Sequence, residues 1–179
     1  MDGRWMAVTG ASQACQAVYH MAVRRCADKR LLDQEIMMKT SSRNAYPGKI
    51  TAVIPGNLSD EVEITLESGE KIYGQISHAS SQNLSLAEGK EAVALVKATE
   101  IMLVADDNDY EFSCRNQFTG KVVKLVRGFV NGEVLIQTPS GMEINATVTL
   151  EGVNRLRLER GCTVVAMFKS PNVLVAVKK

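Results

Sequence analysis

A small set of cationic and hydroxyl side chains occurs twice in the chain, with a constant offset of 72 residues. Arg43 and Arg115 each stand in a Ser-x-Arg-Asn motif. Two lysines and two hydroxyl residues keep the same offset: Lys97 with Lys169, and Ser77 with Thr149. An arginine fork, a lysine ammonium and hydroxyl groups supply hydrogen-bond donors and positive charge, with few acidic residues beside them. A fully ionised tetrahedral oxyanion requires these groups, so the set predicts oxyanion binding.

The same residues also have a purely structural interpretation. In that case Lys97 and its counterpart are solvated charges at strand ends, and Arg43 forms a surface ion pair of small energetic consequence. Positions kept in both copies of a repeat are those that the structural unit cannot easily lose. Duplication of the Ser-x-Arg-Asn motif and of the later lysine therefore favours the binding interpretation.

The sequence around these residues indicates short strands. Residues 61–66 alternate between polar and apolar with period two, and a turn at 67–70 leads into the next strand as an antiparallel hairpin. Leu84, Leu86 and Gly89 indicate a short helical turn and a loop. Five strands are expected in the first copy, and the second repeats them: residues 49–54, 61–66, 71–76, 91–97 and 101–104. This pattern predicts a mainly β protein built from two tandem OB-like five-stranded small barrels.

Four segments are expected along the chain. They are an N-terminal helical segment at 1–40, a first barrel at 41–105, an acidic linker at 106–112 and a second barrel at 113–179. Residues 12–36 contain no proline or glycine, and their apolar residues fall near helical spacing. We expect this segment to form an amphipathic helix whose apolar stripe packs on the same helix of a second chain.

Composition excludes several functional classes. The formal net charge of +1 argues against a broad nucleic-acid or membrane surface. No apolar run approaches the ~20 residues of a membrane span, and no signal segment opens the chain, so a cytoplasmic protein is expected. The four cysteines have no metal-ligand spacing. His20 and His78 have no repeated acid or nucleophile partner, so neither a metal site nor an enzyme is expected.

Three runs in the first copy carry a family resemblance: SSRNAYPGKI at 41–50, LSLAEGKE at 84–91 and LVKA at 95–98. They resemble the Mop, or molybdate-binding, domain, and the resemblance covers about residues 40–179. It implies an OB-like barrel, a homo-oligomer (a dimer is favoured and a trimer is possible) and molybdate or tungstate held at contacts between Mop units. The implied function is sensing, storage or homeostasis of molybdenum. The alternative is an OB-type nucleic-acid binder, which the lack of paired stacking aromatics disfavours.

The resemblance also implies individual ligands. In the first copy these are Ser41 and Arg43 of one unit with Ser77, Ser80 and Lys97 of its partner. In the second copy they are Ser113, Arg115, Thr149 and Lys169. Gly152 stands where Ser80 supplies a hydroxyl in the first copy, so the second set is less complete, although a backbone N–H there could donate instead.

A weaker resemblance concerns the N-terminal segment. Thr9, Gln13 and Tyr19 match the start of the dimerisation helix in molybdate-responsive transcription regulators. A helix-turn-helix domain needs about 60 residues before that point, and eight residues precede Thr9. We therefore expect no specific DNA binding by this chain alone.

Overall fold

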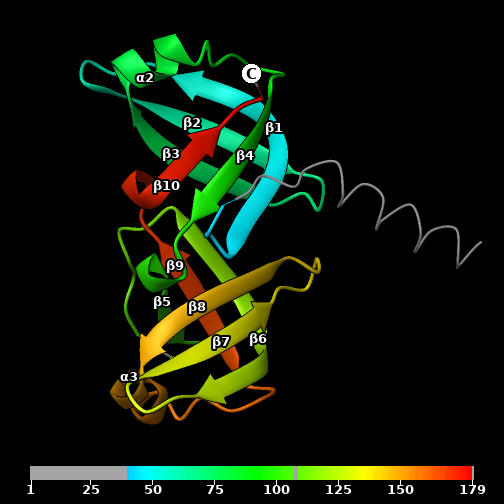
Figure 1. Cartoon of the computed structure of the whole chain (residues 1–179), viewed down its shortest axis with the longest axis vertical. Helices are drawn as coiled ribbons and strands as arrows, with labels where there is room; N and C mark the ends of the chain where they lie inside the picture. The colour runs from blue at the N-terminus through cyan, green and yellow to red at the C-terminus, as the bar shows by residue number, and fades with distance from the viewer. Residues whose placement is uncertain (1–39, 107–108, 179) are drawn as a thin grey trace, which may run out of the picture. The chain divides into compact units, whose positions relative to one another are not determined.

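The computed structural model describes residues 40–106 and 109–178. The predicted helix at 12–36, with Thr9, Gln13 and Tyr19, lies outside the described residues. The first copy of the repeat contains these elements (Figure 1): β1 (Asn44–Ile54), β2 (Ser59–Leu66), β3 (Lys71–Ser77), α2 (His78–Asn83), β4 (Glu91–Val96), the 3-10 turn η1 (Ala98–Glu100) and β5 (Met102–Ala105). The second contains β6 (Asn116–Arg127), β7 (Asn131–Gln137), β8 (Glu143–Thr149), α3 (Leu150–Arg155), β9 (Thr163–Phe168), η2 (Ser170–Asn172) and β10 (Val173–Ala176). No helix within the described ranges is long and apolar enough to cross a membrane.

The strands form two five-stranded, barrel-like sheets, as expected, but each sheet takes its fifth strand from the other copy. The orders are β10-β4-β1-β2-β3, here called the first barrel, and β5-β9-β6-β7-β8, the second barrel. Val173 of β10 lies opposite Val96 of β4, and Met102 of β5 lies opposite Met167 of β9. Figure 1 shows β10 in red beside β4. The expectation that residues 101–104 close the first barrel is therefore wrong.

Strand exchange is possible because the two closing strands are equivalent. Met102 and Leu174 occupy the same repeat position and both are exposed, while the next residues inward, Leu103 and Val175, are buried. Because the two closing strands are equivalent, either one can pair with the edge strand of either sheet at similar energy. Val173 and Val175 also fit against Gly74 of β3, where an added Cβ would meet both valines at 3.4 Å. The exchange thus joins the two barrels into one continuous core.

The alternation predicted for β2 is present, since its even-numbered residues are all buried. Two other elements differ from expectation. The first strand begins at Asn44 rather than at residue 49, and it includes Pro47 opposite Val93 of β4. The helical turn lies at 78–83 rather than at 84–89, because the Ser77 hydroxyl accepts the backbone N–H of Ser80 and fixes the helix start.

Close packing accounts for one duplicated glycine. A Cβ on Gly48 would lie 2.5 Å from the Thr65 carbonyl oxygen, and one on Gly120 would lie 2.6 Å from Ile136 Cγ2. Neither contact can be relieved without moving a buried strand, because backbone or a fully buried side chain stands in the way. The repeat therefore keeps glycine here for the approach of neighbouring strands.

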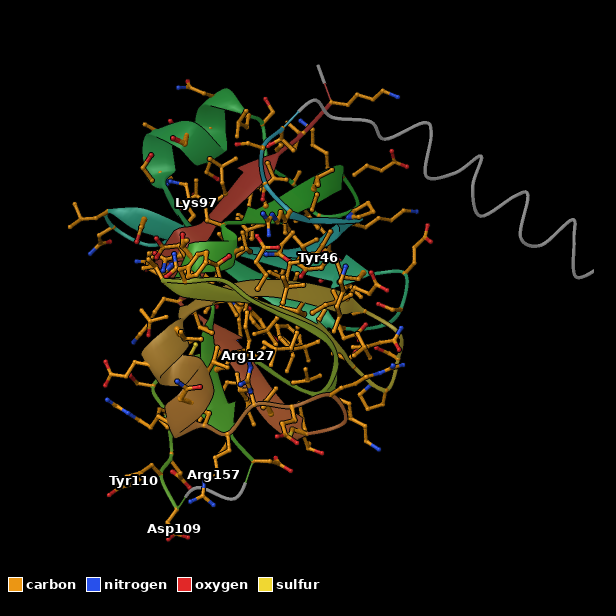
Figure 2. The ribbon with its side chains drawn as sticks, turned by 60° about the horizontal axis from the view of Figure 1, so that its bottom comes forward. Tyr46, Lys97, Asp109, Tyr110, Arg127 and Arg157 are labelled. Atoms are coloured by element: carbon orange, nitrogen blue, oxygen red, sulfur yellow. The ribbon has the colours of Figure 1, made fainter. Side chains whose placement is uncertain are left out.

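The duplicated asparagines tie the two barrels together. Asn44 donates from Nδ2 to the Asn145 carbonyl oxygen and accepts from the Asn145 N–H, both at 2.8 Å. Asn116 makes the same pair of 2.8 Å bonds to the backbone of Tyr73. Both asparagines are buried, and both amides imitate the pairing of a β-bridge. Tyr46, labelled in Figure 2, adds a hydroxyl bond of 3.0 Å to the Glu143 carbonyl oxygen.

Candidate oxyanion-binding site

The hydroxyls predicted as first-copy ligands lie together at the end of β3. Ser77 ends the strand and caps α2, and its hydroxyl lies 2.8 Å from the Ser80 hydroxyl. The Ser77 hydroxyl donates to the Ser80 hydroxyl, and the proton of Ser80 can turn toward an anion. The local sequence therefore places two hydroxyl groups side by side at the end of this strand.

The two arginines occupy equivalent positions just before the first strand of each copy, and each meets a glutamate of the other barrel. Arg43 Nη2 lies 2.7 Å from Glu133 Oε1. Arg115 makes the matching ion pair with Glu61 and also stacks over the Tyr73 ring, 4.0 Å from its centroid. Hydrogen bonding and charge from Arg43 lower the pKa of Glu133. The expectation that few acids accompany these arginines is wrong.

A groove collects three of the four predicted second-copy ligands. Its volume is about 530 Å³, and its lining combines Ser113, Arg115 and Lys169 with first-barrel residues that include Ser59, Glu61 and Gln75. Lys169 Nζ donates to the Ser113 carbonyl oxygen at 2.9 Å and lies 3.2 Å from its hydroxyl. A guanidinium, an ammonium and hydroxyls thus share one open cavity. Such a donor set suits a small oxyanion.

The remaining predicted ligands lie apart from these clusters. Thr149 caps α3 and accepts the Gly152 N–H at 3.1 Å, so the backbone donor expected in place of Ser80 already has a partner. Ser41 and Lys97 are exposed; Lys97, labelled in Figure 2, directly follows β4. Within residues 40–106 and 109–178, no hydrogen bond joins the Ser77–Ser80 pair to Arg43 or Lys97. Hydrogen bonds within the described residues therefore do not join the first-copy set into one cluster.

Comparison with known proteins identifies the family. The profile of the TOBE domain matches residues 40–103 and 113–175. The chain belongs to the TOBE-domain family. The cytoplasmic molybdate-binding protein ModG, solved with molybdate bound, is 39% identical with a TM-score of 0.76, and the match covers 79% of this chain and all of ModG.

Two longer relatives match this chain over most of its length. Molybdenum transport protein ModE of Azotobacter vinelandii is 38% identical over 151 residues, covering 84% of this chain and 55% of ModE. Molybdenum-pterin-binding protein MopA of Rhodobacter capsulatus is 32% identical over 142 residues, covering 79% of this chain and 54% of MopA. The chain thus spans about half the length of these two relatives.

The first TOBE module also holds a contact between a buried aspartate and a half-exposed histidine that sequence reasoning missed. Asp60 is 2% exposed, lies 2.9 Å from His78 Nδ1 and accepts the Gly56 N–H at 3.3 Å. The second module has Gly132 and Leu150 at the corresponding positions. The sequence feature that could have revealed this contact is an aspartate at a position of β2 whose side chain faces the core. His78 adjoins Ser77, so the pair braces the start of α2.

Acid stability should depend on this pair. Hydrogen bonds from His78 and then Ser81 lower the pKa of Asp60. A carboxylate with a depressed folded-state pKa stabilises the protein fully above its unfolded pKa of about 3.9, and this stabilisation is lost as pH falls through the folded value. We expect Asp60→Asn to be less stable than the parent at neutral pH and to lose less further stability below about pH 4. Urea unfolding as a function of pH measures this, and parallel curves for the two proteins would contradict it.

Two arginines of the second TOBE module have partners within that module. Arg155 pairs with Glu151 one helical turn earlier at 2.7 Å, and both side chains are well exposed. Arg127 donates to the Leu158 carbonyl oxygen at 3.2 Å; Arg127 and Arg157 are labelled in Figure 2. Arg155 and Arg127 therefore act in local structure, in keeping with a solvated basic face.

Proposed function

We propose that this chain binds molybdate or tungstate and serves in the sensing, storage or homeostasis of molybdenum. The observation that carries the proposal is the groove in which Ser113, Arg115 and Lys169 meet. The match to ModG, a molybdate-binding protein, covers 79% of this chain and supports molybdate as the class of oxyanion. Molybdate and tungstate are tetrahedral dianions of nearly equal size, so both are included.

We also propose that the first-copy site forms between two chains. One half of the site consists of Ser41 and Arg43, and the other half consists of Ser77, Ser80 and Lys97. No hydrogen bond among the described residues joins the Ser77–Ser80 pair to Arg43 or Lys97 within one chain. Three repeat positions support assembly because they are apolar and exposed in both copies: Ile54/Val126, Leu58/Val130 and Met102/Leu174. Apolar side chains that both copies leave exposed are suited to a contact between subunits. A homo-oligomer follows, with a dimer favoured.

A non-catalytic, cytoplasmic role completes the proposal. The relatives compared above are named as binding or transport proteins, and ModG is described as cytoplasmic. In the described part of the chain, no group of three or more His, Cys, Asp or Glu could hold a metal ion. The duplicated arginines face glutamates rather than forming a continuous basic surface, which supports the absence of specific DNA binding by this chain.

Calorimetric titration with molybdate tests the proposed function. We expect micromolar or tighter binding, no comparable heat with phosphate or sulfate, and a higher melting temperature, because the anion binds the folded assembly and not the unfolded chain. Tungstate should behave like molybdate. Neither heat nor a thermal shift at millimolar molybdate would refute the proposal.

A further inference from the structure

We propose that Glu61 and Glu133 compete with the oxyanion for two arginines: each carboxylate pairs with the guanidinium of Arg115 or Arg43 until a dianion displaces it. This inference rests on the proposed function, since it concerns the same arginines. It assigns to two glutamates a role in selecting ligands by charge.

The glutamates meet the arginines by the same geometry in both halves. Glu61 and Glu133 are separated by the repeat offset, as are Arg43 and Arg115, and each pair spans the two barrels. Glu61 also lines the groove beside Ser113 and Lys169, so its carboxylate stands among the proposed donors. A carboxylate placed there offers the fork two oxygens, much as an oxyanion would.

The pairs are exposed enough to exchange. The side chains of Arg43 and Glu133 are 51% and 50% exposed, and those of Arg115 and Glu61 are 53% and 28% exposed. Ion pairs in such surroundings are weak, because water screens the attraction and solvates both groups after they separate. A dianion doubles the charge that faces the guanidinium, whereas a monoanion offers no more charge than the glutamate. The glutamates should therefore reject singly charged oxyanions while a dianion still binds.

The two pairs differ in the surroundings of the arginine, and Glu61 is less exposed than Glu133. Arg115 lies against the Tyr73 ring, which holds the guanidinium in place by a cation–π contact. The repeat position of Tyr73 is Asn145, which has no ring and reaches only the Arg43 carbonyl oxygen at 3.5 Å. Loss of Glu61 should leave Arg115 positioned for an incoming anion, whereas loss of Glu133 frees a less constrained Arg43.

The test compares Glu61→Gln, Glu133→Gln and the double variant with Glu63→Gln as a matched control. Glu63 pairs with Lys71 at 2.8 Å, so its substitution removes one paired carboxylate without touching either arginine. Molybdate and perrhenate, tetrahedral oxyanions of double and single charge, are titrated calorimetrically into each full-length protein. We expect the Gln variants to bind molybdate roughly 1.5-fold to fivefold more tightly than the parent, the range for releasing a surface ion pair. They should also gain perrhenate binding, and Glu63→Gln should match the parent.

Unchanged or weaker molybdate binding by the double variant, or continued rejection of perrhenate, overturns the inference while leaving the proposed function intact. Failure of every protein, including the parent, to bind molybdate refutes the proposed function and the inference with it. A measurement on the parent protein tests the inference even if the variants do not fold. Arg43 lowers the Glu133 pKa in the free protein, so carboxyl-carbon NMR should show that pKa rising when molybdate displaces Glu133. A Glu133 pKa that stays low at saturation overturns the inference for that pair.

Discussion

Arg43→Ala and Lys97→Ala are each expected to weaken molybdate binding roughly 30-fold or more, the loss that accompanies removal of one charge-assisted donor from a bound anion. Folding should survive, since both side chains are exposed. Arg43→Lys should recover only part of the affinity because lysine lacks the planar fork. Lys71→Ala serves as the control, because it removes an exposed cation that pairs with Glu63 and takes no part in the proposed site.

Mixing the two variants tests whether Arg43 and Lys97 act from different chains. If one subunit supplies Ser41 and Arg43 while its neighbour supplies Ser77, Ser80 and Lys97, a mixed oligomer regains one unmodified site. Co-refolded Arg43→Ala and Lys97→Ala chains should then recover part of the parental molybdate stoichiometry. Parental affinity in either single variant would return that residue to the surface-charge interpretation. A monomeric mass with full binding would contradict the shared site.

Asn116→Ala is expected to lower the free energy of unfolding by about 3 kcal/mol, since it removes two hydrogen bonds and leaves the Tyr73 N–H and carbonyl without their partner. Asn116 is fully buried, so water cannot replace the lost amide at low cost. Asn44→Ala should show a similar loss at Asn145. Chemical denaturation of each variant measures the effect.

The control for the asparagine prediction is Asn131→Ala, the same substitution at an exposed position of β7. It should change stability by less than about 0.5 kcal/mol. A loss below about 1 kcal/mol for Asn116→Ala would mean that the bonds between the barrels contribute little net stability.

The amino-acid sequence by itself determined the repeat, the mainly β fold and the positions of the predicted ligands along the strands. Arg43 and Arg115 immediately precede β1 and β6, Ser77 ends β3 and Lys97 follows β4. These features could be predicted because a constant offset, period-two alternation and turn residues are local properties of the chain. The ligand set itself stays a prediction until anion binding is measured.

The position of the short helix shows where local patterns were insufficient. Leucines and a glycine at 84–89 indicated a turn there, whereas the hydroxyls of Ser77 and Thr149 cap the helices that begin at residues 78 and 150. Ser77 ends a strand and also caps the helix that follows it. The spacing of apolar residues predicts neither the end of the strand nor the start of the helix.

Only the tertiary structure decided which sheet each closing strand joins and which partners the polar residues meet. β5 and β10 have equivalent patterns, so alternation cannot tell the two sheets apart. Arg115 and Glu61 are 54 residues apart in the chain, and Asn44 and Asn145 are 101 residues apart. Such contacts depend on how the barrels pack after the strands exchange, and no local spacing encodes them. The sequence therefore showed that Arg, Asn and Lys are kept in both copies, but it could not show their different roles. The structure shows that the asparagines join the two barrels, while the arginines and lysines stay available to an oxyanion.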